Sequence, residues 1–177
     1  MSSKTYKAIW VTKSEQDGFV SQVAERMLDD LPEGEVLVRV HYSSLNYKDM
    51  LSTQGHPAVT RNFPHQPGID AAGVVESSSD DRFQPGDAVI VSGYDLGMNT
   101  PGGLGQYIRV PAKWVVAMPE GLTAREAMCY GTAGFTSALC IDKLLQMGAG
   151  PEDGTVAVTV AVTVVYVAPP DADSGPQ

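Results

Sequence analysis

Short apolar runs, separated by Gly, Pro, Asp and Asn, follow one another from residue 6 to about residue 137. In the clearest run, Val36, Val38, Val40 and Tyr42 share one face and alternate with the residues between them, a period of two that is typical of a strand. Similar runs predict further strands at 8–12, 19–25, 69–76, 88–92, 106–110 and 114–117. The pattern therefore predicts a compact domain that is mainly β with a few helices.

Helical patterns occupy three segments of the chain. Residues 46–52 form a helix-like turn directly after a predicted strand. Thr123 and Glu126 have the spacing of a capping box, in which the two side chains satisfy each other's backbone donors, so a helix is expected to begin there. A second helix is expected over about 133–147, and Gly148 is its predicted terminator.

The composition changes sharply after residue 150. Residues 155–168 are almost wholly Val, Ala and Thr, which predicts one long C-terminal strand. Both faces of this strand are apolar or nearly neutral, and an exposed edge of this kind recruits other chains. We expect self-association through this segment, unless it folds back on the preceding domain or stays disordered. The tail 169–177, rich in Pro and Asp, is expected to be disordered.

Composition and charge exclude several classes of partner. With 43% apolar and 19% charged residues the chain is ordinary for a globular protein, and its apolar runs are too short to cross a membrane. Residues 1–13 lack the pattern of a signal peptide, so a cytoplasmic location is expected. The net charge of −9 and the scattered basic residues argue against nucleic acid and against anionic lipid surfaces.

The cysteines and histidines show no pattern of a metal site. Cys129 and Cys140 are too far apart for a CxxC pair, and we interpret both as core thiols. His41, His56 and His65 have no mutual spacing that indicates a ligand cluster or a catalytic base, so structural or solvent-facing roles are expected.

Three segments carry a resemblance to a known family. They read SSLNYKD at 43–49, FPHQPGIDAAGVV at 63–75 and GTAGFTSA at 131–138. In the order and spacing of these segments, over about residues 6–159, the chain resembles the medium-chain dehydrogenase/reductase superfamily. Within that superfamily it is similar to the zinc-independent, quinone oxidoreductase-like branch that includes NADPH-dependent acrylyl-CoA reductase.

The resemblance implies a GroES-like β-barrel domain, followed by a helix and one long C-terminal strand. It places a GroES-like catalytic domain at 1–130, a bridging helix at 131–150, and a remnant strand with the disordered tail at 151–177. In the family, NADPH and an activated alkene, here acrylyl-CoA or a related enoyl-CoA or quinone, meet between this domain and a Rossmann domain. A hydride adds to the β-carbon of the substrate and a proton to the α-carbon.

Tyr47 and Asn46 are the catalytic candidates that the resemblance implies. The phenol of Tyr47 is suited to donate a hydrogen bond to a developing enolate oxygen, and its ring to cover a flat cofactor face. The alternative for Tyr47 is a half-buried aromatic at a turn, and for Asn46 a local helix cap. Lys48 and Asp49 are either a solvated pair, or Lys48 attracts a coenzyme A phosphate.

Gly131 and Thr132, together with Tyr47, are the cofactor-binding candidates. Thr132 is suited to hydrogen-bond a nicotinamide amide, while Gly131 and Gly134 permit close approach of the backbone. The alternative is a glycine-rich helix entry that simply packs tightly.

A catalytic metal is not expected. Ile69, before Asp70, stands where zinc-dependent relatives carry a histidine. A catalytic zinc ion needs about three protein ligands, and Cys129 would stand almost alone.

The chain departs from the family after residue 159. Relatives continue there into a glycine-rich turn that binds the cofactor pyrophosphate, whereas residues 160–165 are VAVTVV. A β-branched run does not make such a turn, so no Rossmann fold is expected. A frameshifted or prematurely ended gene, a recombined fragment and a domain with a retained non-redox role are the three explanations.

Two functions remain open from the sequence. The chain is either the catalytic half of an NADPH-dependent reductase, truncated and impaired, or an inactive stand-alone GroES-like binding module. The intact motifs around Tyr47 and Gly131 favour descent from an enzyme, and the absent glycine turn favours inactivity.

Overall fold

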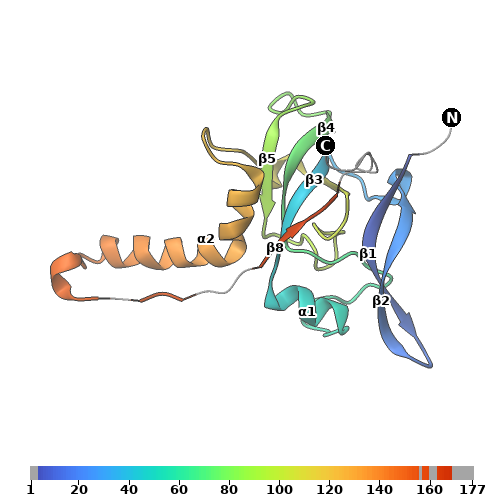
Figure 1. The fold of residues 1–177 in the computed structure, drawn as a ribbon, viewed down its shortest axis with the longest axis horizontal. Coiled ribbons are helices and arrows are strands. Elements are labelled where there is room, and N and C mark those ends of the chain that lie inside the picture. Colours follow the sequence, from blue (N-terminus) through green and yellow to red (C-terminus); the bar gives the residue numbers. More distant parts are fainter. Residues whose placement is uncertain (1–3, 156, 160–162, 169–177) are drawn as a thin grey trace, which may run out of the picture.

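A computed structural model describes residues 4–155, 157–159 and 163–168. Its body is a two-stranded hairpin beside a six-stranded sheet, shown in Figure 1, with sheet order β6-β3-β4-β5-β7 and β8 paired to β3. The hairpin consists of β1 (Thr5–Ser14) and β2 (Gly18–Met27). The strands of the sheet are β3 (Val36–Leu45), β4 (Asp70–Ser78), β5 (Ala88–Ser92), β6 (Tyr107–Val110), β7 (Val115–Ala117) and β8 (Thr163–Tyr166).

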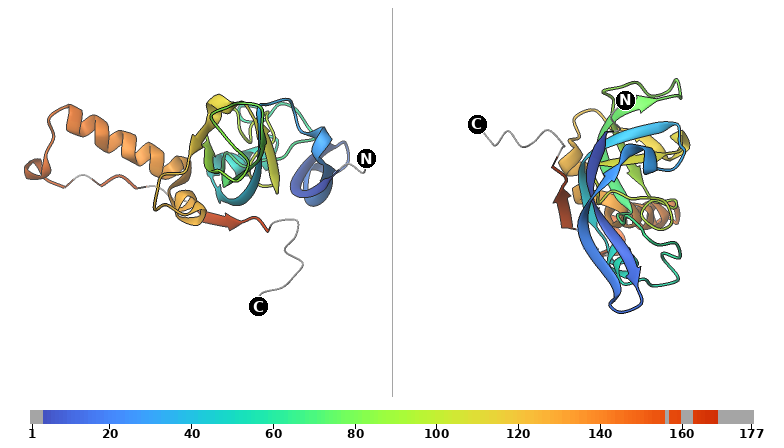
Figure 2. Two further views of the ribbon diagram at one scale, coloured as in Figure 1. Left: turned by 90° about the horizontal axis from the view of Figure 1, so that it is seen from above. Right: turned by 90° about the vertical axis from the view of Figure 1, so that its right-hand side faces the viewer.

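Two α-helices accompany the strands, α1 (Tyr47–Thr53) and α2 (Ala124–Gln146). Short 3-10 turns lie at η1 (Leu28–Asp30), η2 (Ala112–Trp114) and η3 (Pro151–Asp153). Figures 1 and 2 show the second half of α2 leaving the body as an arm. Among the described residues, no helix is long and apolar enough to span a membrane.

β3 pairs with three strands, β4, β6 and β8, and is buried on both faces at its start. Val36, Val38 and Val40 are fully buried in the main core. Leu37, on the opposite face, is buried in a second cluster with Tyr6 of the hairpin. β3 therefore has apolar residues on both faces at its start, because the hairpin covers the face that the main core leaves open.

The predicted class, mainly β with a few helices, is confirmed. The strand predicted at 88–92 has those limits, and the other predicted strands of the body recur with shifted ends. The capping box is present, since the Glu126 N–H donates to Thr123 Oγ1 at 3.2 Å and the Thr123 N–H to Glu126 Oε2 at 2.9 Å. The second helix ends at the Met147 cap, and Gly148 follows with φ 86°.

The expected long C-terminal strand is much shorter in the structure. Strand β8 covers Thr163–Tyr166, whereas residues 155 and 157–159 are not in a strand, and residues 156 and 160–162 lie outside the described residues. β8 pairs antiparallel with Tyr42–Leu45, with Thr163 opposite Leu45. β3 ends at Leu45 and α1 begins at Tyr47, so β3 offers no partner to residues 157–159. The tail 169–177, expected to be disordered, also lies outside the described residues.

The interpretation of both cysteines as core thiols is wrong. Cys129 and Cys140 are exposed. Ala127 and Met128 are the α2 residues beside Cys129 that enter the core, which leaves Cys129 on the outer side of the helix. Cys140 lies on the arm, where the helix runs away from the body.

Candidate functional site

A buried carboxylate gathers side chains from three segments of the chain. Asp70, the first residue of β4, is 0% exposed. Its Oδ2 accepts hydrogen bonds from the Ser44 hydroxyl and from Asn46 Nδ2, the latter at 2.9 Å. Its Oδ1 accepts from Thr132 Oγ1 at 2.7 Å, and the Thr132 N–H lies 3.0 Å from Oδ2. Asp70 therefore brings the predicted site residues Asn46 and Thr132 together.

Gly131 lets the helix backbone approach this carboxylate. Its φ of 50° and ψ of −160° are not helical and kink α2 at this point. A Cβ at residue 131 would lie 2.8 Å from both Asp70 Oδ2 and Ser44 Oγ, too close for any side chain. Because of the kink, the Thr132 N–H has no helical partner and donates to Asp70. Asp70, a residue of β4, therefore caps the N-terminus of the second half of α2. The two helices predicted here are confirmed as the two halves of α2.

The start of α1 fixes the other candidates. The Asn46 N–H donates to Asp49 Oδ2 at 2.7 Å, and the Ile69 N–H donates to Asp49 Oδ1 at 3.0 Å. Asp49 thus links α1 to the residue that precedes Asp70. Tyr47, in contrast, is 72% exposed, so the interpretation as a half-buried aromatic does not hold.

Asp49 is not half of a solvated pair, as one interpretation of the sequence had it. It is 2% exposed, and burial raises the pKa of its carboxyl to about 6, against the opposing effect of its two backbone donors. Lys48 is exposed and its Nζ lies 4.0 Å from Met98 Sδ.

The structure buries the apolar residue that the resemblance aligns with a zinc ligand of zinc-dependent relatives. Ile69 is 5% exposed. No group of His, Cys, Asp and Glu able to hold a metal ion occurs among the described residues. His65 is buried, with Nε2 2.9 Å from the Gly97 carbonyl oxygen, and burial lowers its pKa. His41 is half-buried and His56 is exposed.

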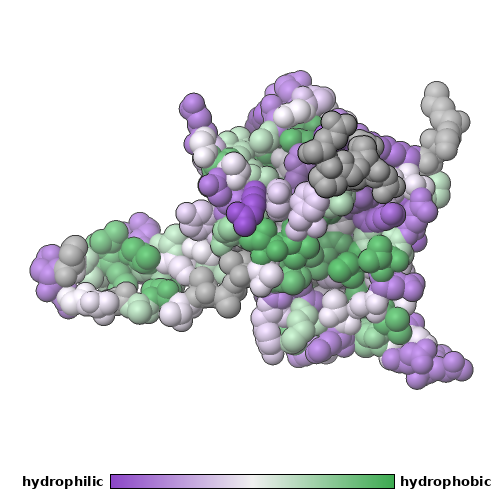
Figure 3. Space-filling view, in the orientation of Figure 1, coloured by the Kyte–Doolittle hydropathy of each residue, from purple (hydrophilic) through white to green (hydrophobic). Residues whose placement is uncertain are grey.

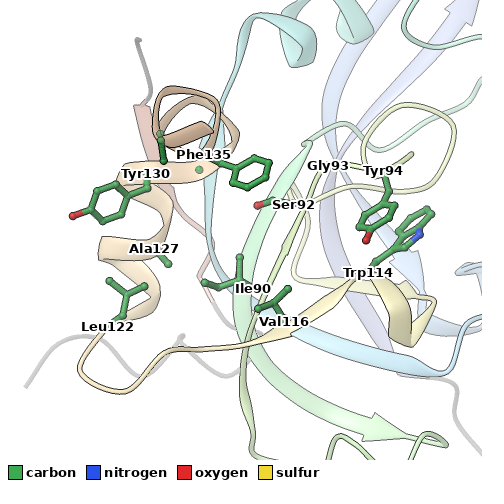
Figure 4. A pocket seen from close by; sticks show the side chains of 13 residues that line it. Ile90, Ser92, Gly93, Tyr94, Trp114, Val116, Leu122, Ala127, Tyr130 and Phe135 are labelled. Carbon is green, nitrogen blue, oxygen red and sulfur yellow. The ribbon is translucent and has the colours of Figure 1, made fainter. Parts of the chain in front are cut away.

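An apolar groove of about 670 Å³ opens beside this network, and Gly131, which lies against Asp70 and Ser44, also lines the groove. Figure 4 shows Leu122, Ala127, Tyr130 and Phe135 on the α2 side, Tyr94 and Trp114 on the other, and Ile90 and Val116 between them. Ser92, Gly93, Gly134 and Ala138 complete the lining. A volume of this order accommodates a small organic ligand.

Sequence reasoning missed Asp70 and the groove. It treated Asp70 only as the neighbour of an absent zinc ligand. An acid at the start of an otherwise apolar strand was the available signal, because a buried carboxylate requires partners. The groove combines residues from β5, η2, β7 and α2, and nothing local in the sequence marks them as neighbours.

The chain is similar in sequence to a known protein family and to curated relatives, and in fold to crystal structures. Residues 32–120 match the family described as the alcohol dehydrogenase GroES-like domain. A probable acrylyl-CoA reductase of Escherichia coli is 50% identical over 149 residues, which is 83% of this chain and 46% of the relative.

The fold of this chain resembles that of two crystal structures. An oxidoreductase from Salmonella enterica in complex with NADP matches with a TM-score of 0.80 and 43% identity, over 84% of this chain and 45% of that one. A Bacillus subtilis protein with NAD bound matches with a TM-score of 0.82 and 44% identity, over 86% and 46% of the two chains. The chain thus spans about half the length of the relatives it matches.

Proposed function

Because the chain belongs to the zinc-independent, quinone oxidoreductase-like branch of the medium-chain dehydrogenase/reductase family, we propose that it supplies the substrate side of an NADPH-dependent reduction. The substrate in this proposal is acrylyl-CoA or a related enoyl-CoA or quinone. The observation that carries it is the Asp70 network, which joins Asn46 to Thr132 beside Gly131 and the groove.

Thr132 and Gly131 suit the nicotinamide end of the cofactor. The Thr132 hydroxyl donates to Asp70, so its oxygen keeps lone pairs that can accept from the N–H of a carboxamide. Gly131 adds no side chain between this oxygen and the groove. Bound NADPH would supply the hydride. Both roles rest on the fixed orientation that Asp70 gives to the start of the second half of α2.

Asn46 and Tyr47 suit the substrate. Asn46 Nδ2 donates to Asp70 and, at 3.1 Å, to Ser44 Oγ, which leaves the side-chain oxygen of Asn46 as an acceptor in a fixed place. The exposed phenol of Tyr47 is free to donate to an enolate oxygen as charge develops on it. In this proposal Tyr47 is the donor and Asn46 orients the substrate.

Pyrophosphate recognition is not supplied by residues 155–168, which contain no glycine. We therefore expect the isolated chain to bind NADPH weakly or not at all. Titration calorimetry tests this expectation, and micromolar affinity would contradict it. Tyr47→Phe would then show whether the phenol contributes to binding.

A chimera tests the reductase proposal directly. Residues 1–154 of this chain would replace the matching part of the Escherichia coli relative, so that the rest of that protein supplies nucleotide binding. We expect NADPH oxidation that depends on acrylyl-CoA or a quinone. Tyr47→Phe should lower kcat by about 10²-fold or more, as loss of an oxyanion donor does. Asn46→Ala should lower kcat by about 10²-fold, because a substrate that is no longer held in its orientation reacts that much more slowly. A folded chimera that binds NADPH but is inactive on every substrate of these classes would refute the proposal.

A second candidate is a GroES-like module that binds a substrate fragment or a protein without reducing it. The absence of glycine from residues 155–168 favours it. A ligand that binds the chain equally well before and after Tyr47→Phe, together with an inactive chimera, would support this alternative.

The kink also supports the proposed organisation of the chain. It falls at Gly131, where the GroES-like domain (1–130) would give way to the bridging helix (131–150) and then to the remnant 151–177. Limited proteolysis tests this division, since cleavage should begin beyond residue 130 and leave the domain intact.

We also propose that the chain self-associates. Figure 3 shows apolar side chains on the arm and across the face that carries β8. Large apolar residues are exposed along the arm, namely Phe135, Leu139, Ile141, Leu145 and Met147. Within the described part of the chain, β8 has β3 as its strand partner and no strand on its other edge. Light scattering of the full chain and of one ended at Gly150, which keeps the arm and lacks β8, tests association through the C-terminal segment, and equal masses at high concentration would contradict it.

A further inference from the structure

A stacked aromatic pair forms one end of the groove. The rings of Tyr94 and Trp114 are 5.3 Å apart between centroids and only 8° from parallel. Trp114 packs against the main core, whereas Tyr94 is 63% exposed. The Tyr94 hydroxyl donates to the Lys113 carbonyl oxygen at 3.3 Å. One face of the Tyr94 ring is thus covered by Trp114, and both residues line the groove, as Figure 4 shows.

The loop that carries Tyr94 holds the ring in one orientation. Tyr94 has a φ of 53°, a left-handed conformation that a non-glycine residue keeps only where its surroundings fix it. Leu96, two residues on, is fully buried in the main core. Asp95 accepts hydrogen bonds from Thr100 Oγ1 at 3.0 Å and from Asn99 Nδ2 at 3.3 Å. The aromatic wall is therefore formed before any ligand arrives, which reduces the entropy that binding must overcome.

The groove offers little to a charged ligand. None of its described lining residues carries a charged side chain. Its polar side-chain groups are three hydroxyls, those of Ser92, Tyr94 and Tyr130, and the indole N–H of Trp114. Aromatic rings attract other flat rings through offset or edge contacts, in addition to the area that they bury. A globular group of equal size touches a flat wall over a smaller area.

We infer that Tyr94 and Trp114 are specificity-determining residues of this groove, which select an uncharged, flat, conjugated ring over a globular apolar group. The inference rests on the proposed function in one respect, that the ligand bound in the groove is a substrate. The binding preference itself needs neither NADPH nor turnover.

Fluorescence of the full chain tests the preference. Trp10→Phe leaves Trp114 as the sole tryptophan, since the sequence has two. The probes are duroquinone, a flat quinone whose substituted ring resists thiol addition, and 1-adamantanol, a globular molecule of equal carbon number. Without nucleotide, duroquinone should quench Trp114 saturably and bind about ten-fold more tightly than 1-adamantanol by calorimetry.

Substitutions at Tyr94 assign the preference to the ring. Tyr94→Ala and Tyr94→Leu should each weaken duroquinone binding about five- to ten-fold, and Tyr94→Phe should leave it within about two-fold. Tyr166→Ala is the matched control, because Tyr166 is also exposed and packs on another ring, that of Tyr42 at 5.3 Å, outside the groove. Circular dichroism confirms that each variant is folded.

Several outcomes would overturn the inference. Equal affinities for the two probes, unchanged duroquinone binding in both Tyr94→Ala and Tyr94→Leu, or an equal loss in Tyr166→Ala would each do so. The chimera experiment is independent of these results. An inactive chimera with intact ring selectivity would refute the proposed function alone, whereas an active chimera without ring selectivity would refute this inference alone.

Discussion

Asp70 Oδ1 accepts a hydrogen bond from Thr132 Oγ1 at 2.7 Å, which joins two residues 62 positions apart. The same carboxylate accepts from the Thr132 N–H at 3.0 Å. A residue at the start of β4 therefore caps the second half of α2, and it holds Asn46 through its other hydrogen bonds. The geometry of the candidate site depends on this one side chain.

Asp70→Asn should destabilise the chain strongly. All of the groups around this carboxylate are donors, so the amide N–H₂ of asparagine would face a donor and leave buried hydrogen bonds unmade. We expect a loss of about 2–4 kcal/mol in the free energy of unfolding by urea titration. The matched control is Asp87→Asn, where an exposed carboxylate accepts from the Gln84 N–H at 2.7 Å and the loss should stay below about 1 kcal/mol.

A double-mutant cycle separates the Thr132 contact from the rest of the network. Thr132→Val alone removes the hydroxyl donor and should cost about 1–2 kcal/mol. Combined with Asp70→Asn, the two losses should be less than additive by at least about 0.5 kcal/mol, because the deleted hydroxyl donates to the Asp70 carboxylate. Strict additivity would mean that Asp70 and Thr132 are not coupled.

Gly131→Ala should destabilise the chain more than Gly148→Ala does. Both glycines have positive φ, 50° and 86°, so alanine is strained at each, at a cost of about 1–2 kcal/mol. Only at residue 131 does the added Cβ meet other atoms, Asp70 Oδ2 and Ser44 Oγ, whereas Gly148 has open space. Urea unfolding should show an excess loss of at least about 1 kcal/mol for Gly131→Ala. Equal losses would contradict the close approach.

Asp49 should make the stability of the chain fall as pH rises. Burial raises the pKa of its carboxyl from 3.8 to about 6, so the folded state binds the proton more tightly than the unfolded state. Its contribution is complete below pH 3.8 and is lost as pH rises to about 6. The free energy of unfolding should therefore be lower above pH 6 than below pH 3.8 by on the order of 3 kcal/mol, since the pKa is raised by about two units and each unit corresponds to about 1.4 kcal/mol.

Urea unfolding of the parent and of Asp49→Asn at pH 4 to 7 checks this slope, since the variant should gain stability relative to the parent as pH rises through the window. Glu126→Gln is the control with the opposite sign. Hydrogen bonds from Thr123 lower the pKa of Glu126, so its contribution is lost as pH falls. Parallel pH profiles for parent and Asp49→Asn would show that Asp49 titrates normally.

The purified chain should hold no stoichiometric zinc. Ile69 stands where the resemblance places a histidine ligand in zinc-dependent relatives, and the described residues contain no cluster of His, Cys, Asp and Glu that could hold the ion instead. Elemental analysis after dialysis should find far less than one zinc ion per chain, and a chelator should leave the Tm unchanged. A tightly held zinc ion would contradict the assignment to the zinc-independent branch.

The sequence by itself determined the features that depend on neighbouring residues. The period-two run of β3, the capping box of Thr123 and Glu126, and the end of the second helix before Gly148 were all predicted, because backbone geometry within a few residues sets them. The motifs around Tyr47 and Gly131 also identified the family before any contact was known.

Only the tertiary structure decided which distant residues meet. No local pattern places Asp70 beside Thr132, or Tyr94 on Trp114, because these contacts depend on how β4, β5, η2 and α2 pack together. The same holds for the exposure of Cys129, which depends on the side of α2 that faces the core. β8 is short for a related reason: propensity favours a long strand, but β3 ends at Leu45, opposite Thr163, and offers no partner to residues 157–159.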